Sequence, residues 1–155
     1  MPTWIVKDMP SQQGRLAVNK GATAGRGHDT ALALAGAGAQ VVLTGHSPAR
    51  GAAALDRIRA AHPGADIRDD TLDLAGLVSV QDFGERFQRR HGTDGALDLL
   101  VNNGISMVPP TRQATADGFE LQFGTAYLSH FALTLQLLPL LVRGRPARAS
   151  VRVST

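Results

Sequence analysis

The chain has 155 residues and a mass of 16.3 kDa, which gives room for one compact domain and argues against a two-domain enzyme. Lys and Arg total 16 against 13 Asp and Glu, so the net charge of +3 is a mild excess that does not suggest a nucleic-acid partner. The absence of cysteine excludes disulfides, thiolate metal sites and cysteine nucleophiles. Residues 1–15 lack the apolar core of a secretion signal and no apolar run approaches the roughly 20 residues that cross a bilayer, so we expect a cytoplasmic protein without a membrane partner.

Short apolar runs alternate with helical patterns along the chain. Residues 1–14 form a polar lead-in, and residues 15–155 form the predicted domain. Ser47 before Pro48 matches a helix N-cap, Ser79 is the expected cap of the next helix, and Pro139 predicts a kink or an early stop in the last one. We expect strands near residues 16–18, 40–44, 66–70, 97–101 and 150–154, and helices near residues 26–37, 48–62, 79–91 and 117–142.

This alternation predicts an α/β protein with a parallel sheet and helices on both of its faces. In such sheets ligands bind beyond the carboxyl ends of the strands, where the strand order reverses. The segments that directly follow each strand are therefore the candidate site.

A glycine-rich loop follows the first predicted strand. Gly21, Gly25 and Gly27 are spaced as G-x-x-x-G-x-G between that strand and a helix. Such glycines permit a tight turn and let the backbone approach a diphosphate at the helix N-terminus. The loop predicts a dinucleotide cradle, and the alternative is a tight turn without a ligand.

The end of the second predicted strand bears on the choice of nucleotide. An NAD site usually has a carboxylate there for the ribose 2′-hydroxyl, whereas this chain has Gly45 and His46. Lys20, Arg26 and Arg50 add positive charge nearby, so we predict NADP, with NAD as the alternative. The alternative interpretation of these basic residues is a solvated surface.

Taken in order, these motifs resemble the short-chain dehydrogenase/reductase family. Residues 21–27 are similar to its T-G-x-x-x-G-x-G motif, and residues 101–104 are similar to its N-N-A-G motif. Residues 116–120 with 123–125 resemble the retinol-dehydrogenase and protochlorophyllide-reductase-like branch. The resemblance implies a Rossmann-type doubly wound parallel sheet with strand order 3-2-1-4-5 that lacks the C-terminal part of the family fold. It implies these cofactor-binding residues: Gly21, Thr23, Ala24, Gly25, Arg26, Gly27, His46, Asp73, Leu74, Asn102, Asn103 and Gly104.

The resemblance also implies a reaction, but several residues that the family uses for catalysis differ in this chain. The family uses a Y-x-x-x-K pair, but the only tyrosine, Tyr127, is followed four residues later by Phe131, and the chain stops before the expected motif. Thr155 aligns with the family serine and is the one candidate catalytic residue, while Ala126 stands where the family has asparagine. Whether this chain is an enzyme therefore stays open.

Two functions remain at this point. The first is a short-chain-dehydrogenase-type domain for NADP(H)-dependent oxidoreduction of a carbonyl or alcohol, inactive as this chain alone. The second is a non-catalytic binding or assembly module, or a truncated fragment, with the same fold. The apolar helix at 117–142 predicts a homo-oligomer interface, and the five histidines show no metal-ligand spacing.

Overall fold

The sheet of this protein has five parallel strands. The computed structural model describes residues 5–92, 94–103 and 109–145, and the backbone of residues 148–151. The strands are β1 (Leu16–Lys20), β2 (Gln40–Gly45), β3 (Ile67–Thr71), β4 (Leu99–Asn102) and β5 (Arg148–Val151). Their order in the sheet is β3-β2-β1-β4-β5, which confirms the predicted doubly wound arrangement.

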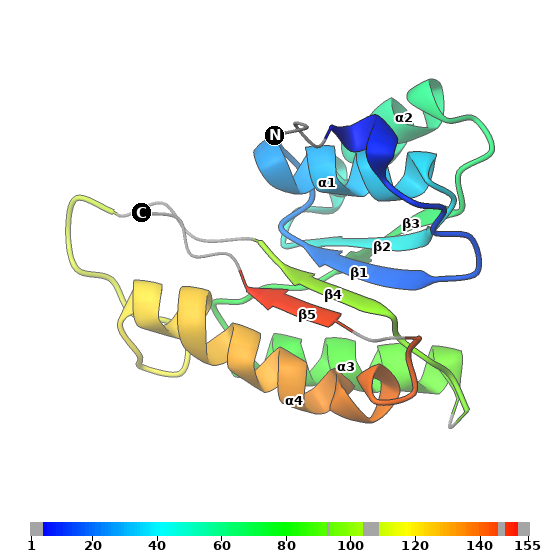
Figure 1. Ribbon diagram of the computed structural model, residues 1–155. Coiled ribbons are helices and arrows are strands. Elements are labelled where there is room, and N and C mark those ends of the chain that lie inside the picture. Colours follow the sequence, from blue (N-terminus) through cyan, green and yellow to red (C-terminus); the bar gives the residue numbers. More distant parts are fainter. Residues whose placement is uncertain (1–4, 93, 104–108, 146–147, 152–155) are drawn as a thin grey trace, which may run out of the picture.

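Helices cover both faces of the sheet, as Figure 1 shows, with α1 and α2 on one face and α3 and α4 on the other. Their bounds are α1 (Gly25–Gly36), α2 (Pro48–Ala61), α3 (Leu77–His91) and α4 (Ser129–Leu141), with a 3-10 turn η1 (Val6–Asp8) and a π-helical segment η2 (Phe123–Leu128).

The central strand β1 contributes to two hydrophobic cores because successive side chains point to opposite faces. Leu16 and Val18 pack with Phe83 of α3 and Leu133 of α4. Ala17 packs on the other face with residues of α1 and α2. All five residues of β1 are buried, which matches a strand covered on both sides.

The start of α3 differs from the prediction. The helix begins at Leu77 with Gly76 as its N-cap, so the predicted Ser79 cap is wrong. The Ser79 hydroxyl oxygen accepts a hydrogen bond from the Asp73 backbone N–H at 2.9 Å. The serine therefore stabilises the loop after β3 rather than the helix end.

The last long helix also begins later than predicted. Residues 114–120 form a loop closed by an antiparallel bridge between Ala114 and Glu120, and helical residues start at 121. The Glu120 carboxylate accepts hydrogen bonds from the backbone N–H groups of Gln122 and Phe123, and these bonds lower its pKa. The carboxylate therefore caps the helix, which the apolar pattern alone does not reveal.

Two predictions concern the C-terminal part of the chain, namely the effect of Pro139 on the last helix and the position of the fifth strand. Pro139 lies inside α4, which continues through it and ends at Leu141, next to the predicted end at residue 142. The proline therefore does not stop the helix early. The fifth strand is observed at Arg148–Val151 instead of 150–154, and the rest of its predicted range lies outside the described residues.

Asp98 links two distant segments at the start of β4. Its buried carboxylate, 3% exposed, accepts hydrogen bonds from the backbone N–H groups of Leu16 at 2.9 Å and Arg145 at 2.7 Å. The carboxylate thus holds the beginning of β1 against the segment that follows α4.

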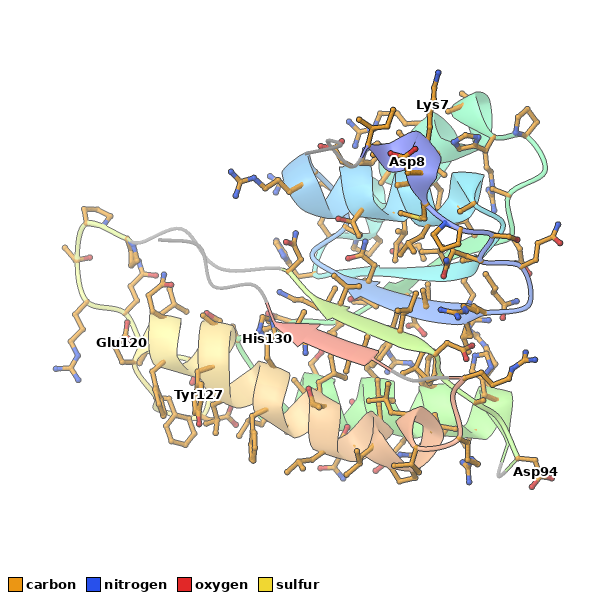
Figure 2. All side chains as sticks on the ribbon, viewed as in Figure 1. Lys7, Asp8, Asp94, Glu120, Tyr127 and His130 are labelled. Atoms are coloured by element: carbon orange, nitrogen blue, oxygen red, sulfur yellow. The ribbon has the colours of Figure 1, made fainter. Side chains whose placement is uncertain are left out.

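We expect Asp98→Ala to lower the free energy of unfolding by about 3 kcal/mol, because it leaves a buried N–H group without an acceptor. Urea denaturation measures the change, with Asp94→Ala as the matched control, since Asp94 is exposed and points away from the domain (Figure 2). Equal stability of the two variants would contradict this role of Asp98.

Candidate functional site

The bend between β1 and α1 is held by glycine geometry. Gly21 has a φ of +76° and Gly25 a φ of +55°, a region that side chains disfavour. Gly27 is buried, and a Cβ there would overlap the Gly21 carbonyl oxygen and approach the Asn103 amide nitrogen to 2.7 Å. The predicted tight turn from the first strand into the first helix is therefore confirmed.

The N-terminus of α1 is open to a ligand. Ala24 is its N-cap and makes no side-chain cap hydrogen bond, and no acidic residue lies in the first turn. The first N–H groups of a helix have no partner within the helix, and the helix dipole favours an anion there. This turn has the chemistry of a phosphate-binding site.

Two side chains that the sequence analysis did not single out hold the loop. The Asn19 amide donates to the Gly27 carbonyl at 2.9 Å, and the Arg57 guanidinium of α2 donates to the Thr23 carbonyl at 2.9 Å. In the sequence, Asn19 stands out as a polar residue inside an apolar strand, which could have indicated its role. Arg57 is far from the loop in sequence, so no local pattern indicated its contact.

A cavity of about 480 Å³ lies next to this loop, a size within the usual range for small-molecule sites. It is formed where β1, β2, β3 and β4 end, as expected for a doubly wound sheet. The predicted cofactor residues that line it are Gly21, Thr23, Ala24, His46, Asp73, Leu74 and Asn103.

The other predicted residues are placed differently. Gly25, Arg26 and Gly27 form the first turn of α1 beside the cavity without lining it. The Asn102 amide donates to the Thr134 hydroxyl of α4 at 3.2 Å, so this amide group is directed at the helix. Gly104 and the catalytic candidate Thr155 lie outside the described residues.

Further residues line the cavity. They are not among the predicted cofactor-binding residues, although the sequence analysis placed Lys20, Gly45 and Arg50 near the nucleotide. Thr125, from the π-helical segment η2, is buried and donates its hydroxyl hydrogen to the Leu121 carbonyl at 2.7 Å. Its only sequence signal was its place in residues 123–125, part of the segment that resembles the retinol-dehydrogenase-like branch. The other additional lining residues are Lys20, Gly45, Arg50, Leu72 and Ala75.

The loop after β3 is fixed by local hydrogen bonds. The Asp73 carboxylate accepts from the Ala75 backbone N–H at 2.9 Å. The Asp117 carboxylate accepts from the Leu77 N–H at 2.8 Å, which joins this loop to the segment before η2. One wall of the cavity is therefore a preformed turn.

Lys20 is the buried cation of the cavity. The residue is only 8% exposed, and burial lowers the pKa of its amino group to about 8, an effect that the negative charge of Asp73 partly offsets. Within the described part of the chain, no carboxylate oxygen lies within salt-bridge distance of this group. The amino group thus adds positive charge to the cavity without a direct salt bridge to any described carboxylate.

The residues present fit a dinucleotide. Gly27 allows a close approach of α1 to the Gly21 backbone that a Cβ would block, and Gly21 has a φ that favours glycine. The helix end supplies N–H donors, and the cavity carries basic groups. Among the described residues, no group of three or more metal-ligating side chains is positioned to hold a metal ion, and no described helix is both long and apolar enough to span a bilayer.

The fold and the cavity together define a dinucleotide-binding domain with a doubly wound parallel sheet. The family model described as short chain dehydrogenase matches residues 15–153. The chain belongs to this family, whose members are NAD(P)-dependent oxidoreductases.

Relatives of known sequence and structure agree with this membership. Polyprenol dehydrogenase from Mus musculus is 44% identical over 86% of this chain and 38% of its own length. Retinol dehydrogenase 12 from Mus musculus is 38% identical over 87% of this chain and 42% of its own length. The Pseudomonas aeruginosa RhlG/NADP complex is 27% identical, with a TM-score of 0.73, over 90% of this chain and 54% of that one. The chain therefore spans about two fifths of these curated relatives.

Replacing Gly27 tests the close approach of α1 to β1. We expect Gly27→Ala to lower the free energy of unfolding by about 2 kcal/mol and to weaken dinucleotide binding at least tenfold, because the new methyl group displaces the loop. Gly64→Ala is the matched control, since a Cβ at Gly64 meets nothing within 4 Å. Thermal denaturation and nucleotide titration measure the two effects, and unchanged binding by Gly27→Ala would refute the close approach.

The buried amino group of Lys20 makes stability depend on pH. Its pKa is about 8 in the folded chain and about 10.4 in the unfolded chain, so the unfolded state binds more protons between these values. The free energy of unfolding should therefore rise from pH 8 to pH 10.5, by up to about 3 kcal/mol.

The variant Lys20→Met should lack this rise, whereas Lys7→Met should keep it, because Lys7 is exposed. Urea denaturation in phosphate-free buffer at several pH values measures the difference. Parallel pH profiles for the unchanged chain and Lys20→Met would contradict the predicted desolvation of Lys20.

Proposed function

We propose that this chain is the NADP(H)-binding domain of an oxidoreductase that transfers hydride between the nicotinamide and a carbonyl or alcohol. The observation that carries the proposal is the uncapped, glycine-rich start of α1, which lies beside a cavity with basic residues. When bound, the nicotinamide ring supplies or accepts the hydride.

The chain's own groups suggest how the cofactor would be held. The backbone of Gly21, Thr23 and Ala24 lies at the loop where N–H donors favour a diphosphate. By the family resemblance, Asp73 and Leu74 would contact the adenine, and both line the cavity on the preformed turn after β3. Asn103, from the end of β4, completes this proposed set of cofactor residues.

The preference for NADP over NAD rests on the end of β2. Gly45 and His46 line the cavity there, with Arg50 beside them, and no carboxylate among these residues would repel a 2′-phosphate. Two structural relatives support the choice: the RhlG/NADP complex and the 3-oxoacyl (acyl-carrier-protein) reductase from Agrobacterium tumefaciens with NADP bound, which is 29% identical with a TM-score of 0.70.

The reacting group is inferred from the relatives. Polyprenol dehydrogenase and retinol dehydrogenase 12 carry an alcohol substrate in their names, which supports an alcohol or its carbonyl product for the whole protein.

A second candidate function is a binding module without the reaction. Tyr127 is 61% exposed and stacks with Phe123 at 5.5 Å and with Phe131 at 6.4 Å, on a surface that does not line the cavity. Ala126, in the same π-helical segment, has no polar group at the position of the family asparagine. We therefore propose that this chain alone binds the nucleotide but does not turn over substrate.

The proposal includes a homo-oligomer and a cytoplasmic location. Aromatic and aliphatic side chains are exposed along η2 and α4 and in the loop before them, at Phe119, Phe123, Tyr127, Phe131, Leu135 and Leu138. Figure 2 shows Tyr127 pointing away from the sheet. Such a face favours association with a second copy. Sedimentation velocity should show a dimer at micromolar concentration, and a strictly monomeric species would contradict this part of the proposal.

Nucleotide titration tests the proposed function. The fluorescence of NADPH should change saturably on binding, with NADH binding at least tenfold more weakly. His46→Asp should reverse this order, because the carboxylate repels the 2′-phosphate and accepts a hydrogen bond from the 2′-hydroxyl of NADH.

The control for His46→Asp is Ala53→Asp, which places the same charge on an exposed position of α2 outside the cavity. It should leave both affinities unchanged. The absence of saturable binding of either nucleotide at millimolar concentration would refute the proposed function.

A further inference from the structure

We propose that Lys20 is a ligand of a cofactor phosphate, with its ammonium group bound to an anionic oxygen inside the cavity. This inference rests on the proposed function, since it assigns a new contact within the same nucleotide site. The resemblance places threonine at this position of the family motif, so the positive charge is a feature of this chain.

The position of Lys20 in the sheet directs its side chain to the cavity. It is the last residue of β1, beside Thr44 of β2 and Asn102 of β4, and it precedes Gly21 of the glycine loop. It lies on the same face of the strand as Leu16 and Val18, by the alternation of side chains. It lines the cavity and is nonetheless 92% covered.

The ammonium group has no partner in the described part of the chain. No hydrogen bond or salt bridge of its Nζ atom is found there, although buried amino groups are normally paired. An ammonium that is desolvated without a counterion costs free energy, and an anionic oxygen in the cavity would offset that cost.

The charged residues that line the cavity favour an anion. Asp73, on the turn after β3, is the acidic residue whose negative charge raises the pKa of Lys20. Asp73 is exposed, and its carboxylate accepts a hydrogen bond from the Ala75 backbone N–H. His46 and Arg50, after β2, add donors or positive charge. With the uncapped start of α1, the cavity thus carries two independent features that favour a phosphate.

Two phosphates of the cofactor share this chemistry. The diphosphate occurs in both NADH and NADPH, whereas the 2′-phosphate occurs only in NADPH. If Lys20 binds the diphosphate, it raises the affinity for NADH and NADPH equally. If it binds the 2′-phosphate, it raises only the affinity for NADPH. Titration with both nucleotides therefore distinguishes binding to the diphosphate from binding to the 2′-phosphate.

The first experiment compares the affinities of NADPH and NADH for the unchanged chain, Lys20→Met, Lys20→Arg and Lys7→Met. We expect Lys20→Met to lose at least tenfold in affinity, for both nucleotides or for NADPH alone, while Lys20→Arg stays within a few fold. Lys7→Met should behave as the unchanged chain. Equal or tighter binding by Lys20→Met, with the unchanged chain still binding, would overturn this inference and leave the proposed function standing. Failure of the unchanged chain to bind either nucleotide would overturn both.

A second experiment uses the unchanged chain, so it does not depend on the folding of a variant. Lys7 and Lys20 are the only two lysines, and Lys7 points away from the domain, as Figure 2 shows. Acetylation by a succinimidyl ester followed by mass spectrometry reports both amino groups at once. Saturating NADPH should slow the labelling of Lys20 at least fivefold and leave Lys7 unchanged. Equal labelling of Lys20 with and without bound NADPH would overturn the inference.

Discussion

The close approach of α1 to the end of β1 is the constraint on which the candidate site depends. Gly27 leaves no room for a side chain against the Gly21 carbonyl, so the helix start lies directly beside the strand end. This packing brings the first N–H groups of α1 to the edge of the cavity. The central position of β1 then places the ends of β2 and β4 next to the same loop. Sheet order and steric contact together therefore define where an anion can bind.

The candidate site also holds groups that destabilise the fold and that, under the proposed function, would favour an anion. Ala24 leaves the first turn of α1 without a side-chain cap, and Lys20 carries a positive charge into a mostly covered position. Each of these features costs the unliganded chain some stability. The cost is offset elsewhere by two well-packed cores and by buried hydrogen bonds such as those of Asp98. Such an exchange of fold stability for ligand affinity is common where a protein binds small molecules.

Much of the fold could be predicted from sequence because its signals are local. The Ser47–Pro48 cap and the glycine loop each specify their own backbone, and the structure confirms both. The errors occurred where a polar side chain bonds to backbone N–H groups, because the pattern of apolar residues does not record such bonds. Ser79 bonds to the loop after β3, and Glu120 caps a helix that its apolar pattern placed earlier. The place of Lys20 at a strand end was a sequence signal for burial of its stem, but its extent of burial depends on which elements surround the end of β1.

The hydrogen bond from Arg57 to the Thr23 carbonyl joins the outer helix α2 to the glycine loop. Any molecule that immobilises the loop consequently restrains α2 as well, and the restraint acts equally in the opposite direction. Residence time of a ligand would then be sensitive to the outer surface of the domain, where a neighbouring subunit or a crowded surface could alter it without ever entering the cavity.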